Sequence, residues 1–132
     1  MNPLKLTALT LVTAFGLTTI ASAKDGALPP ASTKKDVTYA TDIKPIFEAS
    51  CLKCHDSKKE KQGAKLCLDT LAGVLKGAKH GKVVVPGDSA KSELVLSVAH
   101  VGDPDTFKPK KAKKLSDEKI ALIRAWIDQG AK

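Results

Sequence analysis

Three residues close together in the chain form a pattern with a definite chemistry. Cys51 and Cys54 are thiols three positions apart, and His55 follows directly. On one helical turn, two thiols at this spacing can add to the two vinyl groups on one edge of a porphyrin, while the imidazole binds its iron. This C-x-x-C-H pattern is typical of covalent haem c attachment. It predicts one haem c, with Cys51 and Cys54 as thioether anchors and His55 as the proximal iron ligand.

Zinc binding and dithiol redox chemistry are the competing interpretations of these residues. A structural zinc site needs about four ligands, and the chain has neither a second C-x-x-C nor a closely spaced pair of histidines to complete one with Cys67, His80 or His100. A thioredoxin-like dithiol belongs to a βαβ context, which this sequence does not indicate. For Cys67 we expect a small buried core residue, with an intermolecular disulfide as the alternative.

The first 23 residues have the composition of an export signal. A short basic start is followed by an uncharged stretch over residues 6–20 and by Ala21-Ser22-Ala23, the small-x-small form that signal peptidases cleave. The uncharged stretch is shorter than the roughly 20 apolar residues that span a membrane. We therefore predict a signal peptide over residues 1–23, a periplasmic location and no stable membrane insertion after cleavage.

The rest of the chain divides into a leader and one domain. Residues 24–36 are rich in Pro, Ala, Ser and Lys and show no hydrophobic period, which predicts a flexible leader. Residues 37–132 carry the C-x-x-C-H motif and the periodic apolar segments, which predicts a single domain. A domain of this size has a modest hydrophobic core, and a covalent cofactor would enlarge it.

Two amphipathic helices are predicted at the ends of this mostly helical domain. The first starts after Asp42 as its N-cap and leads to Cys51. Its apolar face consists of Ile43, Ile46 and Phe47. The second starts after Ser116 as its N-cap and ends at Gly130. Its apolar face consists of Ile120, Ile123, Trp126 and Ile127.

The motifs of the chain resemble those of the planctomycete-type cytochrome c domains found in exported proteins. The resemblance covers most of residues 37–132. It is carried by Ile43-Lys44-Pro45-Ile46-Phe47, Cys51 to His55, Leu68-Asp69, Val85-Pro86-Gly87, Ser92-Glu93-Leu94 and Trp126 to Ala131. It implies an all-α fold like that of class I cytochromes c, in which the N- and C-terminal helices pack beside a covalently attached haem.

The sequence departs from the family at the position of the second axial ligand. Family members have a Met-Pro-Pro loop whose sulfur binds the iron, whereas here Lys108-Pro109-Lys110 stands at that position and Met1 is the only methionine. The neutral amine of Lys108 is therefore the first candidate for the distal ligand, and His100 is the second. His80, Lys110 and an open or water-filled site are the remaining alternatives.

The distal ligand decides between two functions. Nitrogen ligands on both sides saturate the iron, which favours electron transfer, whereas an open site would suit a gas sensor or a peroxidase-like enzyme. The only arginine, Arg124, is far in sequence from both His80 and His100, so no catalytic pair is evident. We therefore predict an exported monohaem electron carrier rather than an enzyme, with the sensor or peroxidase as the alternative.

Lysine dominates the charge of the chain. The sequence has 22 basic and 14 acidic residues, and loss of residues 1–23 removes one lysine, which leaves a formal charge of +7. Most lysines near the predicted site form two groups, which are Lys53, Lys58, Lys59 and Lys61, and Lys108, Lys110, Lys111, Lys113 and Lys114. Such a surface predicts redox partners with an acidic docking surface. A single arginine and few aromatic residues argue against nucleic acid binding, and we expect a monomer.

Overall fold

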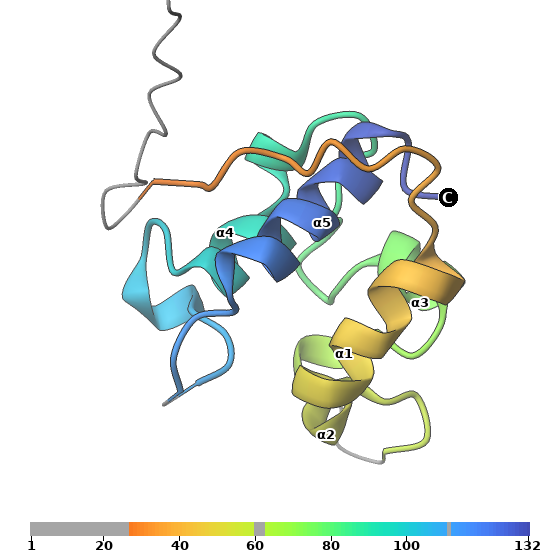
Figure 1. Ribbon diagram of the computed structural model, residues 1–132. Helices are drawn as coiled ribbons and strands as arrows, with labels where there is room; N and C mark the ends of the chain where they lie inside the picture. Colours follow the sequence, from red (N-terminus) through yellow and green to blue (C-terminus); the bar gives the residue numbers. More distant parts are fainter. Residues whose placement is uncertain (1–26, 60–62, 111) are drawn as a thin grey trace, which may run out of the picture.

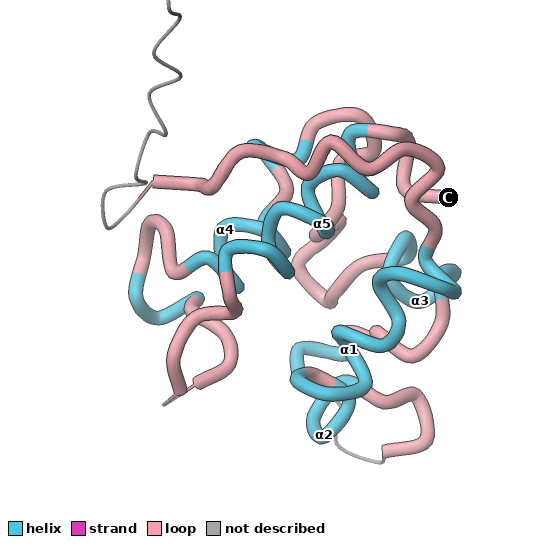
Figure 2. The backbone as a smooth tube through the Cα atoms, viewed as in Figure 1, coloured by secondary structure: helices cyan, strands magenta, loops and turns pink. Residues whose placement is uncertain are grey.

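The described part of the chain is helical. The computed structural model describes residues 27–59, 63–110 and 112–132, so the predicted signal peptide lies outside the described residues. Within this part, the five α-helices are α1 (Lys44–Ser50), α2 (Leu52–His55), α3 (Leu71–Lys76), α4 (Glu93–Ala99) and α5 (Asp117–Asp128). The same part of the chain has an isolated antiparallel β-bridge between Ala78 and Gly81. The predicted all-α class is confirmed, and long loops connect the helices (Figure 2).

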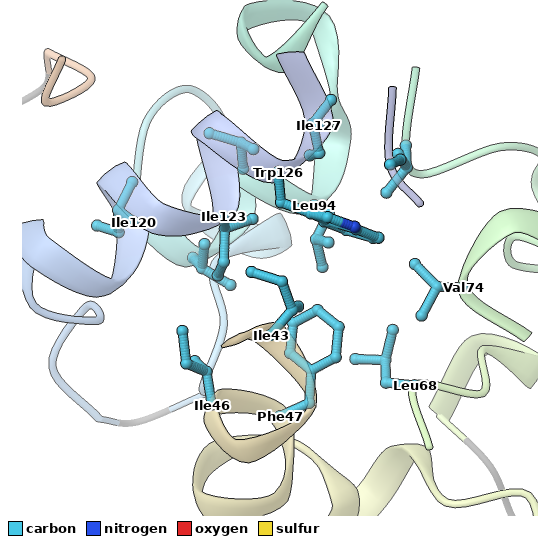
Figure 3. Close-up of a cluster of buried hydrophobic side chains, with 14 of the residues drawn as sticks. Ile43, Ile46, Phe47, Leu68, Val74, Leu94, Ile120, Ile123, Trp126 and Ile127 are labelled. Carbon is cyan, nitrogen blue, oxygen red and sulfur yellow. The ribbon is translucent and has the colours of Figure 1, made fainter. Parts of the chain in front are cut away.

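Helix α5 lies at the centre of the hydrophobic core. Side chains from the segment that ends in α1 point toward α5, and Leu68 and Val74 approach from the side of α3 (Figure 3). Trp126 of α5 and Phe47 of α1 are both completely buried. The ring of Tyr39 is a neighbour of both, with its centroid 6.1 Å from that of Trp126 and 6.3 Å from that of Phe47. The two predicted apolar faces therefore meet in one core.

The start of the first helix differs from the prediction. A π-helical turn, η1 (Tyr39–Ile43), precedes α1, and Thr38 is its N-cap in place of Asp42. The carboxylate of Asp42 instead accepts a hydrogen bond from the backbone N–H of Thr38 (3.0 Å) and pairs with Lys34. Asp42 thus reaches back to the first turn from inside the helix, in the manner of the acidic residue of a capping box.

The predicted flexible leader also differs from the structure, because residues 28–36 pack along α5 (Figure 1). The backbone N–H of Ser32 donates to the carbonyl of Ala121 at 2.9 Å. The guanidinium of Arg124 donates to the carbonyl of Pro29, which is buried. Such an extended segment is held by a few contacts to another element, so it has no hydrophobic period of its own. The packed chain therefore begins before Val37.

The end of α5 confirms the predicted role of Gly130. This residue has a φ of +103°, in the region that favours glycine. Its N–H donates to the carbonyl of Ile127, and the N–H of Ala131 donates to the carbonyl of Trp126, both at 2.9 Å. This pair of bonds is the Schellman arrangement. The predicted cap at the other end of the helix is also confirmed, because the Ser116 side chain accepts from the N–H of Lys119.

A serine and an aspartate attach the start of α4 to α5. The N–H and hydroxyl of Ser89 donate to the two carboxylate oxygens of Asp128 at 2.8 and 3.0 Å. The Nε of Arg124 donates to the hydroxyl of Ser89 at 3.0 Å. The N–H of Gly87, in the predicted Val85-Pro86-Gly87 turn, donates to the carbonyl of Ile127 at 2.7 Å. Helix α5 is therefore bonded to the segment that leads into α4.

Truncation of a core residue in α5 tests this packing. Ile123 is completely buried, so Ile123→Ala should lower the free energy of unfolding by about 2–5 kcal/mol. The measurement is guanidinium unfolding of the haem-loaded protein. Lys119→Ala, an exposed change on the same helix, should stay within about 0.5 kcal/mol of the wild type. Equal stability of the two variants would contradict the central place of α5.

Candidate haem site

The C-x-x-C-H residues form one helical turn directly after α1. Cys51 ends α1 and precedes α2. Its carbonyl accepts hydrogen bonds from the N–H groups of Cys54 and His55, both at 3.1 Å. Cys51 is half-buried and Cys54 is exposed, and both are thiols in the structure. Burial raises the pKa of the Cys51 thiol to about 11, so this thiol stays protonated near neutral pH.

The ring of His55 is held by a carbonyl on the following loop. Its Nδ1 lies 3.2 Å from the carbonyl oxygen of Leu66, and its own carbonyl accepts from the N–H of Leu68 at 2.8 Å. A carbonyl oxygen can only accept, so Nδ1 carries the hydrogen and Nε2 keeps its lone pair. Histidine ligands of metals are oriented in this way by a partner on the other ring nitrogen. His55 is therefore prepared to bind iron through Nε2.

The Leu68-Asp69 segment connects this histidine to the rest of the fold. The carbonyl of Leu68 accepts a hydrogen bond from the Tyr39 hydroxyl at 2.7 Å. Burial, with smaller effects of the negative charges of Asp69 and Glu48, raises the pKa of Tyr39 to about 12. The carboxylate of Asp69 accepts from the N–H of Ser57 at 3.1 Å and from its hydroxyl at 2.5 Å. Hydrogen bonds therefore hold both segments next to the contact between His55 and Leu66, which are Ser57 after His55 and Leu68-Asp69 after Leu66.

Cys67 lies between these contacts and does not join the motif thiols. It is half-buried rather than fully buried, between the buried residues Leu66 and Leu68. Helix α3 approaches it so closely that a Cβ added at Gly73 would lie 2.8 Å from the Cβ of Cys67. A glycine is therefore required for this contact. Cys67 lies beside the core as predicted, but it is less buried than predicted.

The residues of the motif fit a covalently attached haem. Cys51 and Cys54 present two thiols from one turn, and His55 offers a nitrogen whose orientation is fixed. Among the described residues, no group of three or more His, Cys, Asp or Glu side chains could hold a metal ion by itself. The zinc interpretation therefore gains no support from this part of the chain.

The two leading candidates for the distal ligand lie together on the loop after α4. The Nε2 of His100 lies 3.0 Å from the carbonyl oxygen of Lys108. The His100 ring stacks on Phe107, with a centroid separation of 4.7 Å and an interplanar angle of 4°. The amine of the half-buried Lys108 lies 3.4 Å from the carbonyl of Thr106. His80 and Lys110 are both exposed, and His80 lies in the turn closed by the bridge between Ala78 and Gly81.

The loop after α4 encloses part of a cavity, and its end is hydrogen-bonded to α4. The cavity has a volume of about 340 Å³ and is lined in part by His100, Phe107 and Pro109. The N–H of Leu115 donates to the carbonyl of Val98 at 3.2 Å, which attaches the end of the loop to α4. In Figure 1, this loop and α2 both lie below α5, the loop at the lower left and α2 at the bottom of the view.

The fold and the site define a c-type cytochrome. The family model "Planctomycete cytochrome C" matches residues 51–106, which run from the first motif cysteine to two residues before Lys108. The predicted resemblance is thereby confirmed over these residues, where the chain is similar to the planctomycete cytochrome c family. This family implies a covalently bound haem c.

The chain was also compared with curated proteins and with solved structures. No curated protein matches the chain. Among solved structures, a chain described as Kuenenia stuttgartiensis hydrazine synthase is similar, with 25% sequence identity and a TM-score of 0.48. The similarity covers 72% of this chain and 16% of that chain. This chain therefore spans only a small part of the length of that protein.

Replacement of Asp69 tests how the loop behind His55 is held. Hydrogen bonds from Ser57 lower the pKa of Asp69 below its usual value of 3.8. The carboxylate therefore stabilises the fold above that pH, and this stabilisation is lost as the pH falls through the lowered pKa. Asp69→Asn should reduce the free energy of unfolding by about 1 kcal/mol near neutral pH and should make the acid-induced loss of stability smaller.

The measurement is denaturant unfolding of the haem-loaded protein at about pH 7 and about pH 3. Glu118→Gln, which changes an exposed carboxylate in the first turn of α5, is the matched control and should follow the wild type. An Asp69→Asn variant with the same acid dependence as the wild type would show that this carboxylate does not stabilise the fold through its ionised form.

Proposed function

We propose that the protein is an exported monohaem c-type cytochrome that carries electrons between redox partners in the periplasm. The observation that carries this proposal is the hydrogen bond from His55 to Leu66, which leaves a ring nitrogen for iron next to two thiols. When bound, haem c supplies an iron that cycles between the ferrous and ferric states. Cys51 and Cys54 would hold the porphyrin, and the Leu66 carbonyl would orient His55 and increase its basicity.

Two features support an electron carrier rather than a haem enzyme. Arg124, the single arginine of the sequence, donates to Ser89 and to the carbonyl of Pro29, so it is engaged in the packing of α5. The loop with the distal candidates is bonded to α4 at both Lys108 and Leu115. A side chain held within such a loop suits an iron that keeps its ligands through the redox cycle.

The proposed location rests on the composition of residues 1–23, which lie outside the described residues. No helix in the described part of the chain is long and apolar enough to cross a membrane. A signal peptide followed by a haem-binding domain is consistent with export before haem attachment. We therefore place the electron transfer of this protein in the periplasm.

Exposed lysines suggest the chemistry of the redox partners. Lys53, Lys58 and Lys59 are exposed beside the haem motif, and Lys110, Lys113 and Lys114 are exposed on the loop after α4. The remaining lysines of the two predicted groups, Lys61 and Lys111, lie outside the described residues. Positive charge on the two segments would attract an acidic partner and accelerate the encounter at low ionic strength.

The mass of the protein purified from the periplasm tests both its export and its haem content. We expect a chain that begins at Lys24 and carries one covalent haem, because the sequence has one C-x-x-C-H motif. Intact mass spectrometry and the alkaline pyridine spectrum measure these two properties. The spectrum of Cys54→Ala should shift to that of a single thioether bond, and Cys51→Ala with Cys54→Ala should lose covalent haem. A wild-type protein without covalent haem would refute the proposed function.

Charge reversal tests the docking surface. Lys58→Glu with Lys59→Glu should slow oxidation of the reduced protein by ferricyanide severalfold at low ionic strength, because this anionic oxidant is attracted to positive charge. The difference from wild type should shrink as salt is added. Lys35→Glu with Lys132→Glu, at exposed positions outside the two lysine groups, is the matched control. Equal slowing by the two pairs would show that net charge alone, and no local surface, governs the rate.

A further inference from the structure

We infer that Tyr39 is a positioning residue for the proximal ligand His55, and that its hydroxyl helps to set the reduction potential of the haem iron. This inference rests on the proposed function, because it requires a haem bound through His55. It is carried by the hydrogen bond of 2.7 Å from the Tyr39 hydroxyl to the carbonyl of Leu68, in the segment whose Leu66 carbonyl contacts His55. Tyr39 is 29 positions from Leu68 in the chain, so no local pattern indicates this role.

The segment from Leu66 to Leu68 contacts His55 at two points. The Leu66 carbonyl oxygen lies 3.2 Å from Nδ1 of the ring, and the N–H of Leu68 donates to the His55 carbonyl at 2.8 Å. The first contact orients the imidazole, and the second holds the segment against the backbone of the same residue. The hydrogen bond at Nδ1 therefore depends on the position of the whole segment. A group that fixes this segment also fixes the proximal ring.

Leu68 connects the haem motif to the core through both of its backbone polar groups. Its N–H donates to His55, and its carbonyl accepts from the Tyr39 hydroxyl. Leu68 is only 2% exposed, so water cannot readily take the place of the phenol. A buried carbonyl without a donor is unfavourable, so loss of the phenol favours a displaced segment. Tyr39 is the only tyrosine of the chain, so no other phenol can replace it.

The core holds Tyr39 on its backbone and on its ring. Its N–H donates to the carbonyl of Lys132 at 2.9 Å, and the same carbonyl accepts from Nε1 of Trp126 at 2.8 Å. Its ring has Trp126 and Phe47 as neighbours, and both are completely buried. Burial, more than the nearby negative charges, raises the pKa of Tyr39 to about 12, so its hydroxyl remains a donor near neutral pH. The hydroxyl therefore ties the Leu68 carbonyl to a fixed point of the fold.

Two other contacts restrain residues next to Leu68, but in a different way. The carboxylate of Asp69 accepts from Ser57, which is an exposed residue of the loop after the haem motif. Helix α3 lies so close to Cys67 that only a glycine fits at position 73. The first contact joins the segment to another loop, and the second limits its approach to α3. The Tyr39 hydroxyl is the contact that joins the carbonyl of Leu68 to the central core.

The effect on the iron follows from the basicity of the histidine. A hydrogen bond from Nδ1–H of His55 to a carbonyl makes the ring a stronger electron-pair donor. A stronger donor favours the ferric over the ferrous form, so a firm contact with Leu66 lowers the reduction potential. One electron from the redox partner is taken up on reduction, while Nδ1 keeps its proton. A weaker contact should therefore raise the potential.

Removal of the hydroxyl tests this inference in the haem-loaded protein. Tyr39→Phe keeps the ring in the core and should raise the reduction potential above that of the wild type. The Nδ1 proton of His55, followed by NMR of the reduced protein, should exchange with solvent severalfold faster in the variant. Thr38→Ala is the matched control, because it removes a hydroxyl that caps the same π-helical turn. Its potential and its proton exchange should stay those of the wild type.

A core residue without a positioning role would give a different result. Tyr39→Phe would then lower only the stability, while the potential and the proton exchange stayed those of the wild type, and the inference would be overturned. A change in one of these two readouts alone, or equal changes in Tyr39→Phe and Thr38→Ala, would overturn it as well. Absence of covalent haem from the wild type would instead refute the proposed function.

A second change keeps the hydroxyl and covers the case in which Tyr39→Phe does not fold. Because Tyr39 is the single tyrosine, a ring-fluorinated tyrosine supplied during expression replaces it alone. Fluorine makes the phenol a more acidic and therefore stronger donor to the Leu68 carbonyl. The potential should then fall below that of the wild type, opposite to the shift in Tyr39→Phe. An unchanged or higher potential in the fluorinated protein would overturn the inference.

Discussion

Burial of Trp126 against Tyr39 is the contact on which the proximal side of the site depends. Trp126 is completely buried in α5, and its Nε1 donates to the carbonyl of Lys132 at 2.8 Å. The Tyr39 ring packs on it, and the Tyr39 hydroxyl bonds the carbonyl of Leu68. The adjoining Leu66 carbonyl is the one that holds His55. A short series of contacts thus leads from the centre of the core to the predicted iron ligand.

The loop that carries the candidate distal ligands depends on the same helix through different contacts. Asp128 of α5 binds both polar groups of Ser89, just before α4. The other end of α4 supplies the partners of Lys108, which are Ser97 and His100. Helix α5 therefore supports the proximal motif by apolar packing and the distal loop by hydrogen bonds. Because the segments that hold His55 and the loop after α4 are both attached to α5, the fold sets their relative position.

The sequence predicted those features that depend on residues three or four positions apart. The cap at Ser116, the end of α5 at Gly130 and the turn from Cys51 to His55 are local, and each is present. The features that were missed depend on distant partners. Asp42 lost its predicted role because Thr38 caps a π-helical turn. Residues 28–36 pack through partners that are distant in the sequence, which are the core and hydrogen-bonding groups of α5. The pattern of neighbouring residues in the sequence does not predict contacts between residues that are far apart in the chain.

The same distinction explains why the sequence left the distal ligand open. Lys108 and His100 are both chemically able to bind iron, and their spacing does not show which of them is engaged elsewhere. Only the fold reveals that the ring of His100 holds the backbone of Lys108 and that α4 holds both.

These contacts hold the backbone of residue 108 independently of its side chain. Backbone contacts locate residue 108, so a different side chain can occupy that position without rebuilding the loop. If residue 108 occupies the ligand position that the resemblance implies, nitrogen in place of sulfur would lower the potential of the iron. A single substitution on a fixed backbone would thus alter the redox properties of the domain while its haem attachment and core stayed the same.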